Sequence, residues 1–327
     1  MTTIYHEADG DAGALAGAAV AVVGYGNQGR SWALNLRDSG LDVSVCVRAD
    51  STREQAEADG FATRDVARAN DADVLCVLVP DDVMPTLPLA PSSAALTVVA
   101  SGFTLAFGRI EPDGDVGMVA PRMLGPEVRR CYQEGIGFIT AVGVHRDVTG
   151  TARARVLALA GAIGGLRQGA IELTPQQEAV LDLAVEQALA PALTRVSESF
   201  VQVMLEQGVP LEAIVTELVL SGEVERTYGL LRREGFAAQL EYHSPTSQYG
   251  QLSRRDAYAG VDVLTTMRAL VDTIASGRFA DEWDAERDAG YPRLTELKEQ
   301  HAGPAVREFE AALRRELGEG AGFNRSG

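Results

Sequence analysis

The stretch that decides the fold is Ala19–Gly40, "AVAVVGYGNQGRSWALNLRDSG". It begins as a continuous apolar run, which is typical of a parallel strand covered on both faces. A glycine-rich turn follows directly, and the rest has helical composition up to Gly40, where a glycine commonly ends a helix. A second apolar run at 41–47, "LDVSVCV", completes the spacing of a strand–helix–strand unit.

The glycines of this turn each suit a different task at a nucleotide. Gly24 permits a tight turn, Gly26 lets the backbone approach a pyrophosphate, and Gly29 allows the helix to pack closely on the strand. The start of the helix adds free N–H groups and a positive partial charge. In this setting the pattern favours a dinucleotide site over a mere tight turn. The residues of that site are Gly24, Tyr25, Gly26, Asn27, Gln28 and Gly29.

The segment after the second strand bears on which nicotinamide cofactor is used. An acid here accepts hydrogen bonds from the ribose hydroxyls of NAD, whereas arginine and hydroxyl side chains hold the 2′-phosphate of NADP. Asp50 is an acid of this kind. The side chains able to hold a 2′-phosphate are those of Arg48, Ser51, Thr52 and Arg53. The sequence therefore favours NADPH, with NADH as the alternative.

In the remaining chain, the hydrophobic pattern changes near residue 170. Before it, further apolar runs at 71–80, 95–101, 116–121 and 137–145 predict a doubly wound parallel sheet. After it, long helical patterns dominate. We therefore predict an α/β N-terminal Rossmann domain over residues 1–170 and an α-helical domain over residues 171–327.

The first long helix of the second domain has clear end signals. Thr174 is expected to cap it, with Pro175 at the first helical position, and Gly208 is expected to end it. Pro191 lies inside and should kink it.

Composition excludes several classes of function. The 327 residues are 46% hydrophobic and 23% charged, as expected for a globular protein of about two domains, and the formal net charge is −17. Nucleic-acid phosphates would be repelled by this charge. Three cysteines without paired spacing predict neither disulfides nor a zinc motif. Without a secretory signal or a membrane span, we expect a cytoplasmic protein with no membrane partner.

Three acids are spaced by four along the first long helix. Glu178, Asp182 and Glu186 therefore share one helix face, where like charges repel one another. One interpretation is a solvated acidic stripe. The other is a binding site for a hard cation such as Mg²⁺, because apolar residues flank all three acids.

These features together resemble the ketol-acid reductoisomerase family in its shorter, class I form, of which the chain looks like a divergent member. The similarity extends over nearly the whole chain. Besides the turn, it is carried by "LVPDDVMP" (78–85), "SGFTLAFGRI" (101–110), "MVAPRMLGPEVRR" (118–130), "IGGLRQGAIELT" (163–174), "LDLAVEQ" (181–187), "SQYGQ" (247–251) and "GRFADEWDAERDAGYPRL" (277–294).

The resemblance implies a knotted, all-α C-terminal domain that is shared between two subunits, so that a homodimer completes each active site. It also implies a two-step reaction of branched-chain amino-acid biosynthesis. An alkyl group migrates in a 2-acetohydroxy acid with the help of Mg²⁺, and NAD(P)H then reduces the resulting 2-keto acid.

The resemblance also assigns residues. Asp182 and Glu186 match a metal-binding pair, Glu223 matches an acid donated by the partner subunit, and Ser244 matches a serine that contacts the substrate carboxylate. On the cofactor side, the segments after the third and fourth strands supply Pro80, Asp81, Ser101 and Gly102.

Three departures weaken the match at the reaction site. Val219 stands where the family has the second partner-donated acid, Ser101 where it has a histidine, and Arg122 where it has a lysine. The hypothesis is therefore a reductase with a reduced or lost isomerase step, for which Mg²⁺ is retained or dispensable. The alternatives are an imine reductase of a secondary-metabolite pathway and a non-catalytic nucleotide-binding relative.

Overall fold

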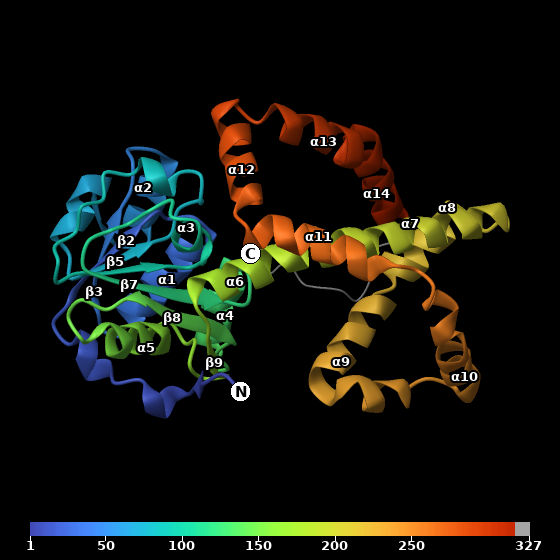
Figure 1. Cartoon of the computed structure of the whole chain (residues 1–327), viewed down its shortest axis with the longest axis horizontal. Coiled ribbons are helices and arrows are strands. Elements are labelled where there is room, and N and C mark those ends of the chain that lie inside the picture. Colours follow the sequence, from blue (N-terminus) through green and yellow to red (C-terminus); the bar gives the residue numbers. More distant parts are fainter. Residues whose placement is uncertain (318–327) are drawn as a thin grey trace. The chain divides into compact units, whose positions relative to one another are not determined.

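The computed structural model describes residues 1–317. The chain forms two compact units, Met1–Leu183 and the part that begins at Ala184, coloured blue to green and green to red in Figure 1. The predicted boundary after residue 170 lies slightly earlier than this division. The difference arises because strand β9 (Ala170–Glu172) and nearly all of helix α6 (Pro175–Ala184) fold with the first unit.

The first unit is built on one nine-stranded sheet with the order β1-β9-β8-β7-β6-β5-β2-β3-β4. Besides β9, its strands are β1 (Ile4–Tyr5), β2 (Ala19–Val23), β3 (Asp42–Cys46), β4 (Ala62–Arg64), β5 (Val74–Val77), β6 (Leu96–Val99), β7 (Asp115–Pro121) and β8 (Thr140–Arg146).

Six neighbouring strands, from β4 through β2 and β5 to β7, run parallel, and this confirms the doubly wound arrangement. The run at 137–145 does not continue the parallel pattern, because β8 pairs antiparallel with β7. The chain leaves β7 at Pro121 and re-enters at Thr140, directly opposite, so β8 must run back. The prediction of a purely parallel sheet is thus wrong at this edge.

Both faces of the sheet are buried, which explains the unbroken apolar runs. Val20 and Val22 of β2 pack into the hydrophobic core on one side, and Ala21 and Val23 into the core on the other. The helices of this unit are α1 (Asn27–Asp38), α2 (Ser51–Ala58), α3 (Phe103–Ala106), α4 (Gly125–Gln133), α5 (Ala152–Ala162) and α6. The three cysteines are buried.

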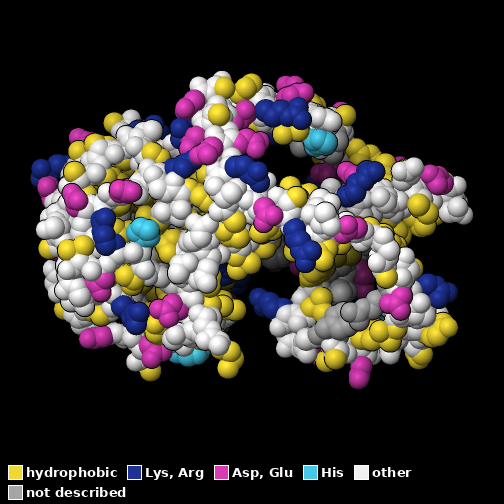
Figure 2. Space-filling view, viewed as in Figure 1, with side chains coloured by type: hydrophobic (Ala, Val, Ile, Leu, Met, Phe, Trp, Pro, Cys, Tyr) yellow, Lys and Arg dark blue, Asp and Glu magenta, His cyan; other side chains and the backbone are white. Residues whose placement is uncertain are grey.

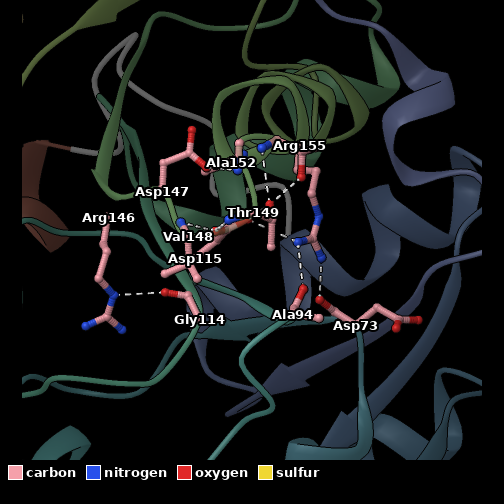
Figure 3. A network of polar contacts seen from close by, with 12 residues as sticks. Asp73, Ala94, Gly114, Asp115, Arg146, Asp147, Val148, Thr149, Ala152 and Arg155 are labelled. Carbon is pink, nitrogen blue, oxygen red and sulfur yellow. Dashed lines mark hydrogen bonds and ion pairs between the residues drawn. The ribbon is translucent and has the colours of Figure 1, made fainter.

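A buried carboxylate ties strand β7 to the turn after β8 (Figure 3). Asp115 is fully buried and accepts hydrogen bonds from the Val148 and Thr149 N–H groups at 2.8 and 3.0 Å and from the Thr149 hydroxyl at 2.6 Å. Arg155 of α5 lies 3.4 Å from the same carboxylate. Burial alone would raise the pKa of Asp115, but the hydrogen bonds from Thr149 and Val148 and the charge of Arg155 together outweigh it, and the pKa is lowered.

Asp115→Asn is expected to destabilise the protein by about 3 kcal/mol, because it leaves Arg155 without its buried partner and three donors facing an amide. A lowered pKa contributes stability above the ordinary pKa of the carboxyl, and this stability is lost as the pH falls through the lowered value. The variant should therefore also show a weaker acid dependence. Urea unfolding measures both. Asp147→Asn, in the same turn but exposed, is the control, and an equal loss there would refute the assignment.

The second unit is helical, and residues 184–317 contain no strand. Its α-helices are α7 (Ala190–Glu206), α8 (Leu211–Val215), α9 (Glu223–Leu240), α10 (Pro245–Arg254), α11 (Val263–Ala275), α12 (Arg278–Asp288), α13 (Pro292–Ala302) and α14 (Pro304–Leu317). No helix among residues 1–317 is long and apolar enough to cross a membrane.

The predicted long helix after Thr174 is interrupted. The Thr174 hydroxyl accepts from the Gln177 N–H at 3.2 Å, which confirms the cap. However, α6 and α7 are separated by a π-helical turn at Val185–Leu189, and Pro191 lies in the first turn of α7. The helical path continues through this turn, since the Ala190 N–H donates to the Val185 carbonyl five residues earlier, and Pro191 removes the next donor from the ladder. α7 ends at Glu206, just before Gly208, whose φ is +79°.

Candidate active site at the carboxyl edge of the sheet

The turn between β2 and α1 has the geometry that its three glycines predict. Gly24 has a φ of +93°, and a Cβ there would lie 2.8 Å from the Leu78 carbonyl oxygen. A Cβ on Gly29 would overlap the Gly24 carbonyl oxygen. Gly26 caps α1, and a Cβ on it would meet nothing within 4 Å. The first and third glycines are therefore needed for the fold, whereas the second leaves open space beside the helix N-terminus.

Two further residues of the turn, Tyr25 and Gln28, contact the protein with their side chains. Tyr25 is buried, and its hydroxyl donates to Asp59 at 2.8 Å. Burial, followed by this bond, raises the pKa of Tyr25. Gln28 donates to the Met123 carbonyl at 3.2 Å. Because these two side chains are engaged within the protein, we expect the predicted cofactor contacts of Tyr25 and Gln28 to come from their backbone.

In the loop from β3 into α2, the residues predicted at the cofactor ribose differ in how firmly the protein holds their side chains. Asp50 caps α2 by accepting from the Thr52 N–H at 3.0 Å and also from its hydroxyl, and these bonds lower the pKa of Asp50. Arg53 is committed to the protein, because it donates to the Val47 carbonyl at 2.8 Å and to Asp65 at 2.7 Å. Arg48 is 82% exposed and lies 3.7 Å from Asp50.

Three loops meet at the carboxyl edge of the sheet, where ligands of doubly wound proteins bind. Asp81 follows β5, Ser101 and Gly102 follow β6, and Arg122 follows β7. Helix α6 contributes Glu178, which sequence reasoning noticed in the acidic stripe but did not include among the site residues. The spacing of Glu178 from Asp182 was its signal.

Glu178 joins these loops. It is only 2% exposed, and one of its oxygens accepts from the Gly102 N–H at 2.6 Å. Its other oxygen accepts from Nη2 of Arg122, while Nη1 of Arg122 donates to Asp182 at 3.1 Å. Burial raises the pKa of Glu178, although the Gly102 N–H and Arg122 oppose this shift.

The positive charge between two acids of the helix face is therefore an arginine. The interpretation as a solvated stripe is wrong for Glu178, and Arg122 offsets the repulsion between Glu178 and Asp182. Asp81 lies in the same acidic surroundings, where burial and then the charge of Glu178 raise its pKa to about 6.

The remaining predicted metal ligands lie in the second unit. Glu186 belongs to the π-helical turn, and Glu223 is the first residue of α9, where it lies 3.8 Å from Arg226. The Ser244 hydroxyl caps α10 by accepting from the Ser247 N–H at 3.3 Å. Within residues 1–317, no three His, Cys, Asp or Glu side chains gather closely enough to hold a metal ion. The family-matched acids therefore do not form a metal-binding cluster within residues 1–317 of a single chain.

Val219, the position matched to the second acid of the pair, is separated from Glu223 by a break in the helix. Val219 lies within a π-helical turn at Thr216–Leu220, and Gly222 follows two residues after this turn with a left-handed φ of +73°. This glycine ends one helix, and Glu223 begins the next. Positions 219 and 223 therefore do not share a helix face, as a metal-binding pair spaced by four would.

Comparisons with known proteins agree with the two-domain fold. Residues 14–169 match the family model "Acetohydroxy acid isomeroreductase, NADPH-binding domain", and residues 176–319 match "Ketol-acid reductoisomerase, C-terminal domain". A curated ketol-acid reductoisomerase (NADP(+)) from Caldivirga maquilingensis is 39% identical over 306 residues, covering 91% of this chain and 93% of the relative. One from Saccharopolyspora erythraea is 35% identical over 327 residues, covering 96% and 97%.

A solved structure shows the same architecture. It is an NADH-preferring ketol-acid reductoisomerase from an uncultured archean, with a TM-score of 0.88 and 30% identity, covering 96% of this chain and 98% of that one. The two domain models and these relatives together span almost the entire chain. The protein is therefore an NAD(P)H-dependent oxidoreductase and belongs to the ketol-acid reductoisomerase family.

Proposed function

We propose that this member of the family reduces a 2-keto acid with NADPH and has a reduced or absent isomerase step. The observation that carries the proposal is the guanidinium of Arg122 between Glu178 and Asp182. Both oxygens of Glu178 are engaged, and one oxygen of Asp182 faces the arginine. Alkyl migration in this family depends on metal charge at such carboxylates, whereas hydride transfer depends mainly on how the nicotinamide and its acceptor are positioned.

The test separates the two half-reactions. The protein is given NADPH with either 2-acetolactate or the rearranged 2-keto acid, 3-hydroxy-3-methyl-2-oxobutyrate, and NADPH oxidation is followed. We expect oxidation with the keto acid. Oxidation with a cyclic imine but not with the keto acid would instead identify an imine reductase, and no oxidation with any acceptor would identify a nucleotide-binding relative.

The cofactor preference is proposed to depend on the β3–α2 loop. Among the arginines predicted there, Arg48 has its side chain in solvent while Arg53 is held by Val47 and Asp65. The Ser51 hydroxyl, at the first position of α2, is also exposed. Ser51 and Arg48 are thus the groups able to reach a 2′-phosphate at the lowest cost, because the ion pair of Arg48 with Asp50, at 3.7 Å, is exposed to solvent.

Arg48→Ala is expected to raise the Kd for NADPH about tenfold and to leave that for NADH nearly unchanged, because a charge-assisted hydrogen bond to the 2′-phosphate is worth about 1.5–3 kcal/mol. Titration calorimetry with both cofactors measures this. Arg53→Ala is the matched control and should lower the melting temperature without changing the ratio of the two affinities. Equal effects of Arg48→Ala on both cofactors would refute the assignment.

We further propose a homodimer formed through the second unit. An exposed apolar stripe runs along the π-helical turn and α7, with residues spaced alternately by four and three as in a coiled-coil seam. It consists of Leu189, Leu193, Val196, Phe200 and Val203, each at least 42% exposed. Figure 2 shows such hydrophobic side chains at the surface of this unit. Three residues of the stripe, Val196, Phe200 and Val203, also line an apolar groove of about 710 Å³ between α7 and α11.

A second copy is the occupant that fits this surface, because the family resemblance implies that two subunits share their helical domains. Val196→Lys is expected to shift the protein from dimer to monomer at micromolar concentration, since the side chain is 61% exposed in one chain and would bury an unpaired charge in a dimer. Sedimentation equilibrium measures the mass. Thr194→Lys, which does not line the groove, should leave the dimer intact. A monomeric parent protein would contradict the proposal.

A further inference from the structure

The contacts of Arg122 suggest a second role for this residue, beyond holding Glu178. Its guanidinium forms a fork in which Nη2 donates to buried Glu178 and Nη1 donates to Asp182 at 3.1 Å. The Asp182 side chain is 49% exposed, so that solvent reaches one side of it while the arginine covers another. Asp182 is also the first acid of the family-matched metal pair.

Two cations cannot share this carboxylate without cost. The guanidinium is always charged, and Glu178 holds its other nitrogen from within the protein. A divalent ion on Asp182 would lie next to this fixed positive charge and would compete with Nη1 for the same group. Displacing the arginine would in turn weaken the neutralisation of Glu178, which is almost fully buried.

We propose that Arg122 competes with a divalent metal ion for Asp182 and thereby weakens metal binding by this chain. The inference rests on the proposed function, in which Asp182 keeps its place as a metal ligand while the isomerase step is reduced. A lysine at position 122 would act differently. Its single ammonium group can remain on Glu178 without forking to Asp182, and it would leave the exposed carboxylate free for the ion.

The experiment measures Mn²⁺ binding to the full chain by the electron paramagnetic resonance signal of free Mn²⁺, without substrate or cofactor. Mn²⁺ stands in for Mg²⁺ because both prefer oxygen ligands. Arg122→Lys is expected to lower the Kd by about tenfold or more, the size of effect that groups beside metal ligands commonly have on affinity. Arg122→Gln should lower it at least as far, provided that it remains folded, and Arg122→Lys keeps the test valid if it does not.

Two controls locate the effect. Arg129→Lys changes another arginine of the first unit, which pairs with Asp38 at 2.6 Å away from the site, and should leave the Kd unchanged. Asp182→Asn in the Arg122→Lys background should abolish the gain. An unchanged Kd in Arg122→Lys, an equal gain in Arg129→Lys, or a gain that survives Asp182→Asn would overturn the inference. The readout involves no turnover, so a failure of the proposed reductase activity would be seen separately.

Discussion

With 2-acetolactate, NADPH and millimolar Mg²⁺, the purified protein is expected to form the reduced dihydroxy acid far more slowly than about 1 per second, a rate ordinary for metabolic enzymes. The reason lies in the number of carboxylates that are free to bind metal. Glu178 is buried and fully hydrogen-bonded, Asp182 is paired with Arg122, and Val219 replaces an expected acid.

The second metal-binding pair is further weakened by the backbone. Gly222 separates Val219 from Glu223, so restoring an acid at position 219 would not by itself rebuild a pair on one helix face. Two divalent ions need enough carboxylate charge to offset four positive charges in a small space. With Asp182, Glu186 and a partner's Glu223 as the family-matched acids, this charge falls short.

The measurement follows dihydroxyisovalerate by chromatography, so that NADPH oxidation by other routes is not mistaken for the complete reaction. The control is the rearranged 2-keto acid with the same preparation, which is expected to be reduced at least about a hundredfold faster than acetolactate is converted, a difference of some 2.7 kcal/mol in barrier. Full conversion of acetolactate at ordinary metabolic rates would show that the three departures from the family pattern do not impair the isomerase.

The first unit could be predicted from its sequence largely because its signals are local. The alternate packing of Val20 and Val22 against one core and of Ala21 and Val23 against the other requires a continuous apolar run, and such a run is visible without any structure. The same holds for Thr174, whose capping bond reaches only three residues along the chain. In both cases the interaction partners lie in the same element or on a buried face.

What could not be predicted depends on contacts between distant parts of the chain. The spacing of Glu178 and Asp182 predicts that the two like charges repel each other, but Arg122 lies 56 and 60 residues away from them, and no periodicity links the two segments. The reversed direction of β8 likewise follows from where the chain re-enters the sheet. Val219 is matched to the second acid by its place in the sequence alone, and the left-handed Gly222 between Val219 and Glu223 has no signal in the spacing of the two positions.

The two helix-proximal glycines of the nucleotide turn are expected to respond to alanine in opposite ways. In Gly29→Ala the new Cβ would overlap the Gly24 carbonyl oxygen, which is backbone and cannot move aside, so a loss of about 3 kcal/mol in unfolding free energy is expected.

In Gly26→Ala the Cβ points into open space, and the φ of −78° suits alanine, so stability should change by less than about 1 kcal/mol.

Gly26→Ala, which is expected to keep its stability, should instead lose affinity for the cofactor. The methyl group of Gly26→Ala would occupy the space through which a pyrophosphate approaches the N-terminus of α1, and the Kd for NADPH should rise at least about a hundredfold, because the phosphates would lose the N–H groups and the positive end of the helix. Urea unfolding and calorimetric titration of both variants measure the two effects independently. A folded Gly26→Ala protein that binds NADPH as tightly as the parent would mean that the open space beside this glycine is not the pyrophosphate site.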